Sequence, residues 1–169
     1  LSAGVTVNGN FSNWDANEPN NSSGVEHFGI LKNNGKWNDG DSFPSNSKAI
    51  IEVNTLIASL AGYEYVGQYN GHTYFYKNNA GSWSDENLNA LASGAYLCII
   101  SSQAENDFIA QNTPIGFWGA WIGLYQDLND PGYSEPAGGW KWVNGVSLPT
   151  GVPAATYLWS TGDTTESIS

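Results

Sequence analysis

The chain has 169 residues, of which 40% are hydrophobic and 14% aromatic, which is enough for one packed domain and excludes a disordered segment. Sixteen acidic residues against five basic ones give a net charge of −11, so nucleic acid and anionic membrane surfaces are unfavourable partners. The lone cysteine, Cys98, excludes an internal disulfide. No stretch reaches the roughly 20 apolar residues of a membrane span.

The first half of the chain predicts strands separated by polar loops. Residues 1–13 alternate as a strand does and run into an Asn-rich loop. A short strand is expected near residues 28–31, and residues 48–53, KAIIEV, read as a compact buried strand. After a short connection at 55–61, the run YEYVGQYNGHTYFYK at 63–77 predicts a β-hairpin, because Asn-Gly favours its tight turn.

A helix is predicted next. Ser82 with Asp85 three residues later is the start of a capping box, and Gly94 ends the helix. Its buried stripe is expected to consist of Leu88, Leu91 and Ala92.

The rest of the chain predicts a second helix and more strands. A strand at 95–100 is followed by a helix that Ser102 and Glu105 begin, and we interpret Glu105 as a cap rather than a catalytic acid. Further strands are expected at 118–125 and 138–145, separated by a long loop. The fold class is therefore α+β, with loops long enough to carry a function.

Short oxygen-bearing side chains cluster in the loop between Trp14 and Asp39. They are Glu18, Asn20, Glu26, Asn38 and Asp39. Calcium takes six to eight oxygen ligands from such groups, so the cluster predicts a calcium site. The alternative is that Asn, Asp and Gly simply mark polar loops. Trp14 and Trp37, which bracket the cluster, are expected to pack in the core.

These motifs resemble a known family. The segments SWSDENLNALASGAYLCIISSQAENDFIAQ, WIGL and SEPAGGWKWVNG resemble the first half of a C-type lectin-like domain. NWDANEPNN, VEHFGI, GKWND and KAIIEV resemble the second half, including its EPN and WND signatures. The resemblance covers roughly residues 10–54 and 62–146 and is to bacterial members that lack disulfides.

The two halves stand in reversed order, since in the family WIGL precedes EPN. Circular permutation, a tandem array cut across two adjacent modules, and a long insertion each account for this order. We expect one closed domain over residues 1–147, with the second half of the fold at 1–54 and the first half at 55–147. Residues 148–169 resemble the start of an immunoglobulin-like module, which suggests a piece of a longer bacterial surface protein.

The resemblance implies a role for each clustered residue. In the sugar-binding members the positions matching Glu18, Asn20, Glu26, Asn38 and Asp39 hold one calcium ion. Two sugar hydroxyls complete its shell while they bond to Glu18, Asn20, Glu26 and Asn38. Pro19 would follow a cis peptide bond, and EPN is the mannose, N-acetylglucosamine or fucose type. Asp127 is the candidate for a second calcium site.

The resemblance thus implies a calcium-dependent carbohydrate-binding module of a secreted or cell-surface adhesin, whose partners are extracellular glycans. The alternative is a protein-binding or spacer module of such an adhesin that uses the same fold without sugar. An enzyme is not expected, because the chain has no nucleophile elbow, phosphate-binding glycine loop or zinc-ligand spacing. Nucleic-acid binding and membrane insertion are not expected either.

Overall fold

The computed structural model describes residues 11–42, 47–78 and 80–148. Most of the strand predicted at residues 1–13 lies outside this part of the chain. So does nearly all of the immunoglobulin-like start predicted at 148–169.

The described residues form eight strands and two α-helices, confirming the α+β class. In chain order they are a 3₁₀ turn (Ser22–Gly24), β1 (Phe28–Leu31), β2 (Trp37–Gly40), β3 (Lys48–Val53), β4 (Glu64–Tyr69), β5 (His72–Lys77), α1 (Trp83–Ala92), β6 (Tyr96–Leu97), α2 (Gln103–Asn112), β7 (Ala120–Gln126) and β8 (Trp140–Trp142). Among them, no helix has the length and apolar character needed to cross a bilayer.

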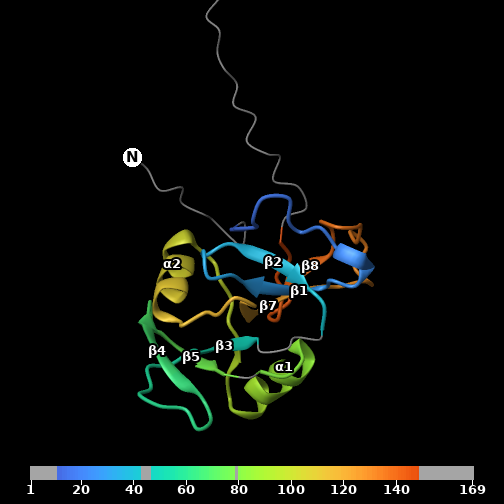
Figure 1. The fold of residues 1–169 in the computed structure, drawn as a ribbon. Coiled ribbons are helices and arrows are strands. Elements are labelled where there is room, and N and C mark those ends of the chain that lie inside the picture. The colour runs from blue at the N-terminus through green and yellow to red at the C-terminus, as the bar shows by residue number, and fades with distance from the viewer. Residues whose placement is uncertain (1–10, 43–46, 79, 149–169) are drawn as a thin grey trace, which may run out of the picture.

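One sheet contains strands from both sides of the 55–61 connection. Its main path is β2-β1-β7-β3-β5-β4, with β6 added to β3 and β8 added to β7 (Figure 1). β7 lies between β1 and β3, antiparallel to the first and parallel to the second. The strands before the 55–61 connection are therefore hydrogen-bonded to strands that follow it.

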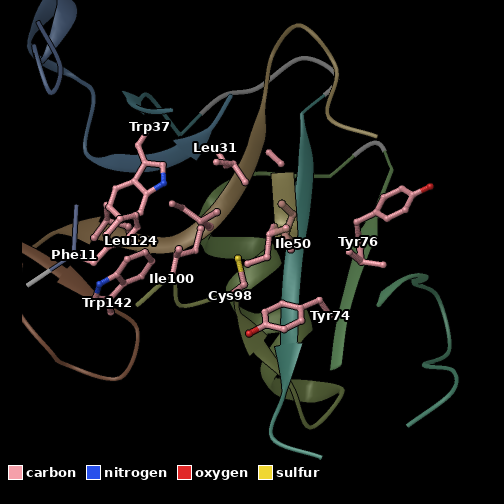
Figure 2. Packing of buried hydrophobic residues seen from close by; sticks show 14 of the residues in the cluster. Phe11, Leu31, Trp37, Ile50, Tyr74, Tyr76, Cys98, Ile100, Leu124 and Trp142 are labelled. Carbon is pink, nitrogen blue, oxygen red and sulfur yellow. The ribbon is translucent and has the colours of Figure 1, made fainter. Parts of the chain in front are cut away.

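Apolar side chains project from both faces of this sheet. On β3, Ile50 packs on the face that α2 covers through Ile109, whereas Ile51 packs on the face that α1 covers through Ala90. Figure 2 shows the first of these clusters, in which the rings of Trp37 and Trp142 meet edge-to-face with centroids 5.5 Å apart. Because successive strand residues point to opposite faces, a nearly continuous apolar run such as KAIIEV is what a strand covered on both sides requires.

The strands predicted at 28–31 and 48–53 and the hairpin at 63–77 are confirmed. The hairpin turn has positive φ at both Asn70 and Gly71, as its tight turn requires. The sequence reading missed β2, because WNDG lacks the alternation of a strand. Pairing with β1 fixes it in the sheet, with Ile30 opposite Asn38.

The predicted buried stripe of α1 is wrong. Leu88 and Leu91 are 65% and 58% exposed, and Ala92 is also exposed. The helix instead buries the face that carries Trp83, Glu86 and Ala90. Glu86 can lie inside because its carboxylate accepts from Lys77 Nζ at 2.9 Å and from the Gly81 N–H at 2.8 Å.

The capping predictions for both helices are confirmed. Ser82 Oγ accepts from the Asp85 N–H at 3.1 Å, and Ser102 Oγ accepts from the Glu105 N–H at 3.2 Å. The two serines thus satisfy backbone donors that the first helical turns leave free. α2 also supports the candidate site, because its Asn106 accepts the indole N–H of Trp37 at 2.8 Å, at the start of β2.

Candidate functional site

Asp39 on β2 organises the loop that carries Glu18 and Asn20. Its carboxylate accepts from the Asn20 N–H at 3.1 Å to each oxygen and from the Asn21 N–H at 2.7 Å. The side chain is fully buried, and a buried charge requires such donors. The buried Trp37, two residues earlier, confirms the expected core role of that tryptophan and holds the strand in place.

Glu26 is held against the same loop. Its Oε2 accepts from the Ser22 N–H at 2.8 Å, and its own N–H donates to Asn21 Oδ1 at 3.0 Å. Burial and the charges of Asp39 and Asp41 raise the pKa of the Glu26 carboxyl, partly offset by the Ser22 N–H. Asn21 therefore links Glu26 to Asp39, a positioning role that the sequence analysis did not assign to it.

Glu18 has the most perturbed carboxyl of the cluster. Burial raises its pKa to about 7, together with a hydrogen bond to Asp39 and the negative charges of Asp39, Glu26 and Asp15. Its Oε2 is buried and has no hydrogen-bond partner among the described residues. The Glu18–Pro19 peptide bond is cis, as the resemblance implied. An orphaned acceptor beside two further carboxylates is the electrostatic setting in which a cation is stabilising.

The two asparagines are less tightly held. Asn20 is exposed, and Asn38 is half-buried with its side-chain amide donating to the backbone oxygen of Asp39. Within the described parts of the chain, no three Asp, Glu, His or Cys side chains converge closely enough to form a metal centre. The structure thus brings Glu18, Glu26 and Asp39 within electrostatic reach of one another without arranging them around a single point.

Asp127, the candidate for a second calcium site, is paired with a cation of the protein itself. Lys141 Nζ lies 2.8 Å from an Asp127 oxygen and 2.7 Å from an Asp130 oxygen. Hydrogen bonds from Lys141 lower the pKa of both carboxyls, and the two aspartates raise that of the ammonium. The lysine thus supplies positive charge at the position where the resemblance suggested an ion.

A groove of about 370 Å³ opens beside the cluster, and Glu26, Asn38 and Asp39 contribute to its wall. Phe117 and Trp118 border it and are both exposed. The sequence analysis assigned Trp118 to a buried strand, which is wrong, since β7 begins only at Ala120. The signal it overlooked is a pair of adjacent aromatics between two glycines.

A larger cavity, of about 590 Å³, lies elsewhere and includes Glu52 and Glu105. Glu105 accepts from Tyr74 Oη at 2.6 Å and from the Ser101 N–H at 2.8 Å. Glu52 accepts from Tyr96 Oη at 2.7 Å and from the Ile99 N–H at 3.0 Å. Since every oxygen of the two carboxylates is engaged by the protein, these acids support the fold there.

Comparison with known proteins finds relatives of one kind. The chain is 30% identical over 95 residues to the CD209 antigen of Symphalangus syndactylus and 30% identical over 84 residues to asialoglycoprotein receptor 1 of Rattus norvegicus. It is also 30% identical over 78 residues to the human protein named C-type lectin domain family 10 member A. The matched stretches cover 56%, 50% and 46% of this chain, but only 22%, 26% and 21% of the respective relatives.

No protein-family model matches the chain, and no solved structure matches it. The relatives' names are those of an antigen, a receptor and a C-type lectin protein, which agrees with the prediction that the chain is not an enzyme. About half of the chain is thus similar to C-type lectin proteins, and its α+β fold, with two helices and one mixed sheet, is C-type lectin-like.

Proposed function

We propose that the chain is a calcium-dependent carbohydrate-binding module with its site at Glu18, Asn20, Glu26, Asn38 and Asp39. The observation that carries the proposal is the buried, unpartnered Oε2 of Glu18 beside the carboxylates of Asp39 and Glu26. Holding these negative charges together without a cation is unfavourable, as the raised pKa of Glu18 indicates. The similarity to an asialoglycoprotein receptor and to a C-type lectin protein supports a sugar as the ligand.

The residues present fit a hard cation, because carboxylate and amide oxygens are the ligands calcium prefers. Bound there, the ion would supply a Lewis-acidic centre for two neighbouring sugar hydroxyls. Glu18 and Glu26 would accept hydrogen bonds from those hydroxyls, and the amides of Asn20 and Asn38 would donate to them. Asp39 would remain the buried anchor, since its carboxylate already holds the loop backbone. The EPN motif at Glu18, Pro19 and Asn20 resembles that of the mannose, N-acetylglucosamine or fucose type, so these sugars are the proposed ligands.

The proposal includes a rearrangement of side chains. Because the carboxylates do not converge in the described structure, the side chains of Glu18 and Glu26 would have to turn toward a common point to hold the ion. The hydrogen bonds from the Asn20 and Asn21 N–H groups to Asp39 would hold the loop backbone at these two residues, while Glu26 would give up its hydrogen bond from the Ser22 N–H.

We further propose that residues 1–147 make one module, with 148–169 leading into the next one, of a secreted or cell-surface adhesin. The sheet order supports a single module, since β7 is hydrogen-bonded between β1 and β3. An adhesin would bind glycans outside the cell through many copies, because single sites of this kind are weak.

Titration calorimetry with mannose, with and without calcium, tests the proposed function. We expect heat of binding in calcium, none after chelation, and none in Glu18→Gln with calcium present. Asp107→Asn is the matched control, because Asp107 is an exposed acid on α2. A glycan array in calcium extends the test to other sugars. Calcium binding with no glycan bound would favour a protein-binding module instead, and no calcium binding would favour a spacer.

A further inference from the structure

The cavity of about 590 Å³ that includes Glu52 and Glu105 is bordered by strands and by both helices. Its wall takes Glu52 from β3, Tyr74 from β5, Asn87 and Leu91 from α1, and Glu105 from α2. Its volume lies within the range of small-molecule pockets. None of the five residues of the proposed sugar site contributes to this wall, so the cavity is a separate candidate site.

Two buried carboxylates give this cavity negative charge. Glu52 and Glu105 are 3% and 7% exposed, and the donors that hold them are neutral hydroxyl and N–H groups, which fix the carboxylates without cancelling their charge. Among the described residues of the wall there is no lysine or arginine. His72 Nδ1 lies 2.6 Å from Glu52 Oε1, but the imidazole carries a charge only when protonated. Burial raises the pKa of the Glu52 carboxyl, and the charge of Glu105 adds to the rise, against hydrogen bonds from Tyr96 and Ile99.

The same wall has acceptor capacity that the protein does not use. Asn87 Oδ1 is buried, and no described residue donates a hydrogen bond to it. An ionised carboxylate has about four acceptor positions, and the hydrogen bonds that Glu52 receives from Tyr96 Oη and the Ile99 N–H occupy two of them. Because an unsatisfied buried acceptor is unfavourable, a donor that enters the cavity would be stabilised at Asn87.

Apolar and aromatic side chains make up another part of the wall. Leu91, Ile99 and Val143 contribute hydrocarbon side chains, and Tyr69 and Tyr96 contribute aromatic rings. Leu91 is 58% exposed, so a hydrocarbon chain placed against it would remove apolar surface from water. Aromatic rings also attract an ammonium ion to their faces. The cavity thus combines buried acids with an exposed apolar side chain.

We infer that this cavity is a second binding site, which takes a primary ammonium group on a hydrocarbon chain, as in a free alkylamine or the side chain of a lysine. The three N–H donors of the ammonium would bond to the buried carboxylates and to Asn87 Oδ1, and the chain would lie along Leu91. A metal ion fits less well, because no three Asp, Glu, His or Cys side chains of the described residues are grouped to hold one. The inference does not depend on the proposed function.

Titration calorimetry in chelator at pH 8 compares pentylamine, which is protonated at this pH, with pentanol, which has the same chain and no charge. We expect pentylamine to bind and pentanol to bind about tenfold more weakly or not at all. A second pair of probes is Nα-acetyl-lysine methylamide and its Nε-acetylated form, since acetylation removes the charge. Binding of the charged lysine probe would show that the site accepts a lysine side chain, and binding of pentylamine alone would restrict it to free amines.

Asn87→Lys tests the position of the site, because it places the protein's own ammonium group on the cavity wall and leaves both buried acids in place. We expect pentylamine to bind this variant about tenfold more weakly. Asn89→Lys is the matched control, because it makes the same change of charge at an exposed position of α1 outside the cavity, and the affinity should stay unchanged. If unfolding curves show that Asn87→Lys is not folded, Leu91→Lys, at an exposed position of the same wall, takes its place.

Three results would overturn the inference. The first is that neither ammonium probe binds, or that pentylamine and pentanol bind equally. The second is an equal loss of affinity in the wall variant and in Asn89→Lys, which would assign the binding to the net charge of −11 rather than to the cavity. The third is displacement of pentylamine by calcium, which would show that the cavity takes a metal ion. None of these results bears on the proposed sugar site, because the two sites share no residue.

Discussion

The carboxylate of Asp39 holds the backbone of Asn20 across a gap of 19 residues, with the Asn20 N–H at 3.1 Å from both carboxylate oxygens. The same carboxylate accepts a hydrogen bond from the Asn21 N–H at 2.7 Å. A side chain on a sheet strand thereby positions a loop that has little regular structure of its own. The geometry of the loop depends on this buried charge.

Asp39→Asn should destabilise the protein, because the amide keeps only one acceptor oxygen for the N–H groups of Asn20 and Asn21 and lacks the charge that strengthens these hydrogen bonds. We expect the free energy of unfolding to fall by about 1–3 kcal/mol, which is the range for weakening hydrogen bonds to a charged acceptor. Urea unfolding in chelator at pH 6 measures it, since Glu18, with a pKa of about 7, is then mostly neutral and does not repel Asp39. The exposed control Asp107→Asn should change stability by less than about 0.5 kcal/mol. A similarly small change for Asp39→Asn would contradict the anchoring role.

Removing calcium should lower the melting temperature if the proposed site is right. A ligand at 100 times its Kd stabilises the native state by about 2.7 kcal/mol, or roughly 5–10 °C for a chain of this size. Glu26→Gln should show little difference between calcium and chelator, because it removes one of the three charges. Calorimetric scans measure both proteins at pH 8. If calcium does not change the melting temperature of the unaltered protein, the proposed metal site is wrong.

Exchanging the acid and the amide around Pro19 should change the sugar that is preferred. In Glu18→Gln/Asn20→Asp the hydrogen-bond acceptor and donor trade places, so the pair fits a different arrangement of hydroxyls. We expect binding to shift from mannose toward galactose, as read by competition between the two sugars for an immobilised glycan. Titration with calcium serves as the control for an intact site. An unchanged preference in a folded, calcium-binding variant counts against these two residues as the selective pair.

Lys141→Met should destabilise the loop that contains Asp127 and Asp130. Without the ammonium, which lies within 2.8 Å of both, the two carboxylates lose their shared cation. Thermal unfolding should show a lower melting temperature at pH 7. Lys32→Met is the control, because the structure gives the side chain of Lys32 no ion pair with any described carboxylate.

The same pair predicts a pH dependence. The pKa values of Asp127 and Asp130 are lowered from 3.8, so their stabilising contribution is present above that value and is lost as the pH falls through the lowered pKa values. Between pH 5 and pH 2 the unaltered protein should therefore lose more stability than Lys141→Met does. Urea unfolding gives the free energy of unfolding of both proteins at each pH, and the difference between them removes the effect of other carboxylates. If this free energy falls with pH equally in both proteins, the ion pairs contribute nothing to stability.

Local patterns were enough to predict several elements. Asn70-Gly71 predicted the hairpin, and Ser82 and Ser102 predicted both helix starts, because turns and caps depend on residues a few positions apart. The EPN and WND motifs marked the candidate site through their resemblance to a family. These features depend on short-range geometry or on recognisable residue order.

Other features depended on contacts between distant segments. The buried face of α1 is set by Lys77, which allows Glu86 inside and leaves Leu88 exposed. β2 is a strand because β1 pairs with it, although WNDG has no strand pattern. Lys141 lies beside Asp127 only because β8 pairs with the end of β7. Residue types and their order were sufficient to propose which side chains could bind an ion and a sugar. Which of them face one another, and which aromatics remain outside, was decided by tertiary packing, since burial and charge pairing depend on partners far along the chain.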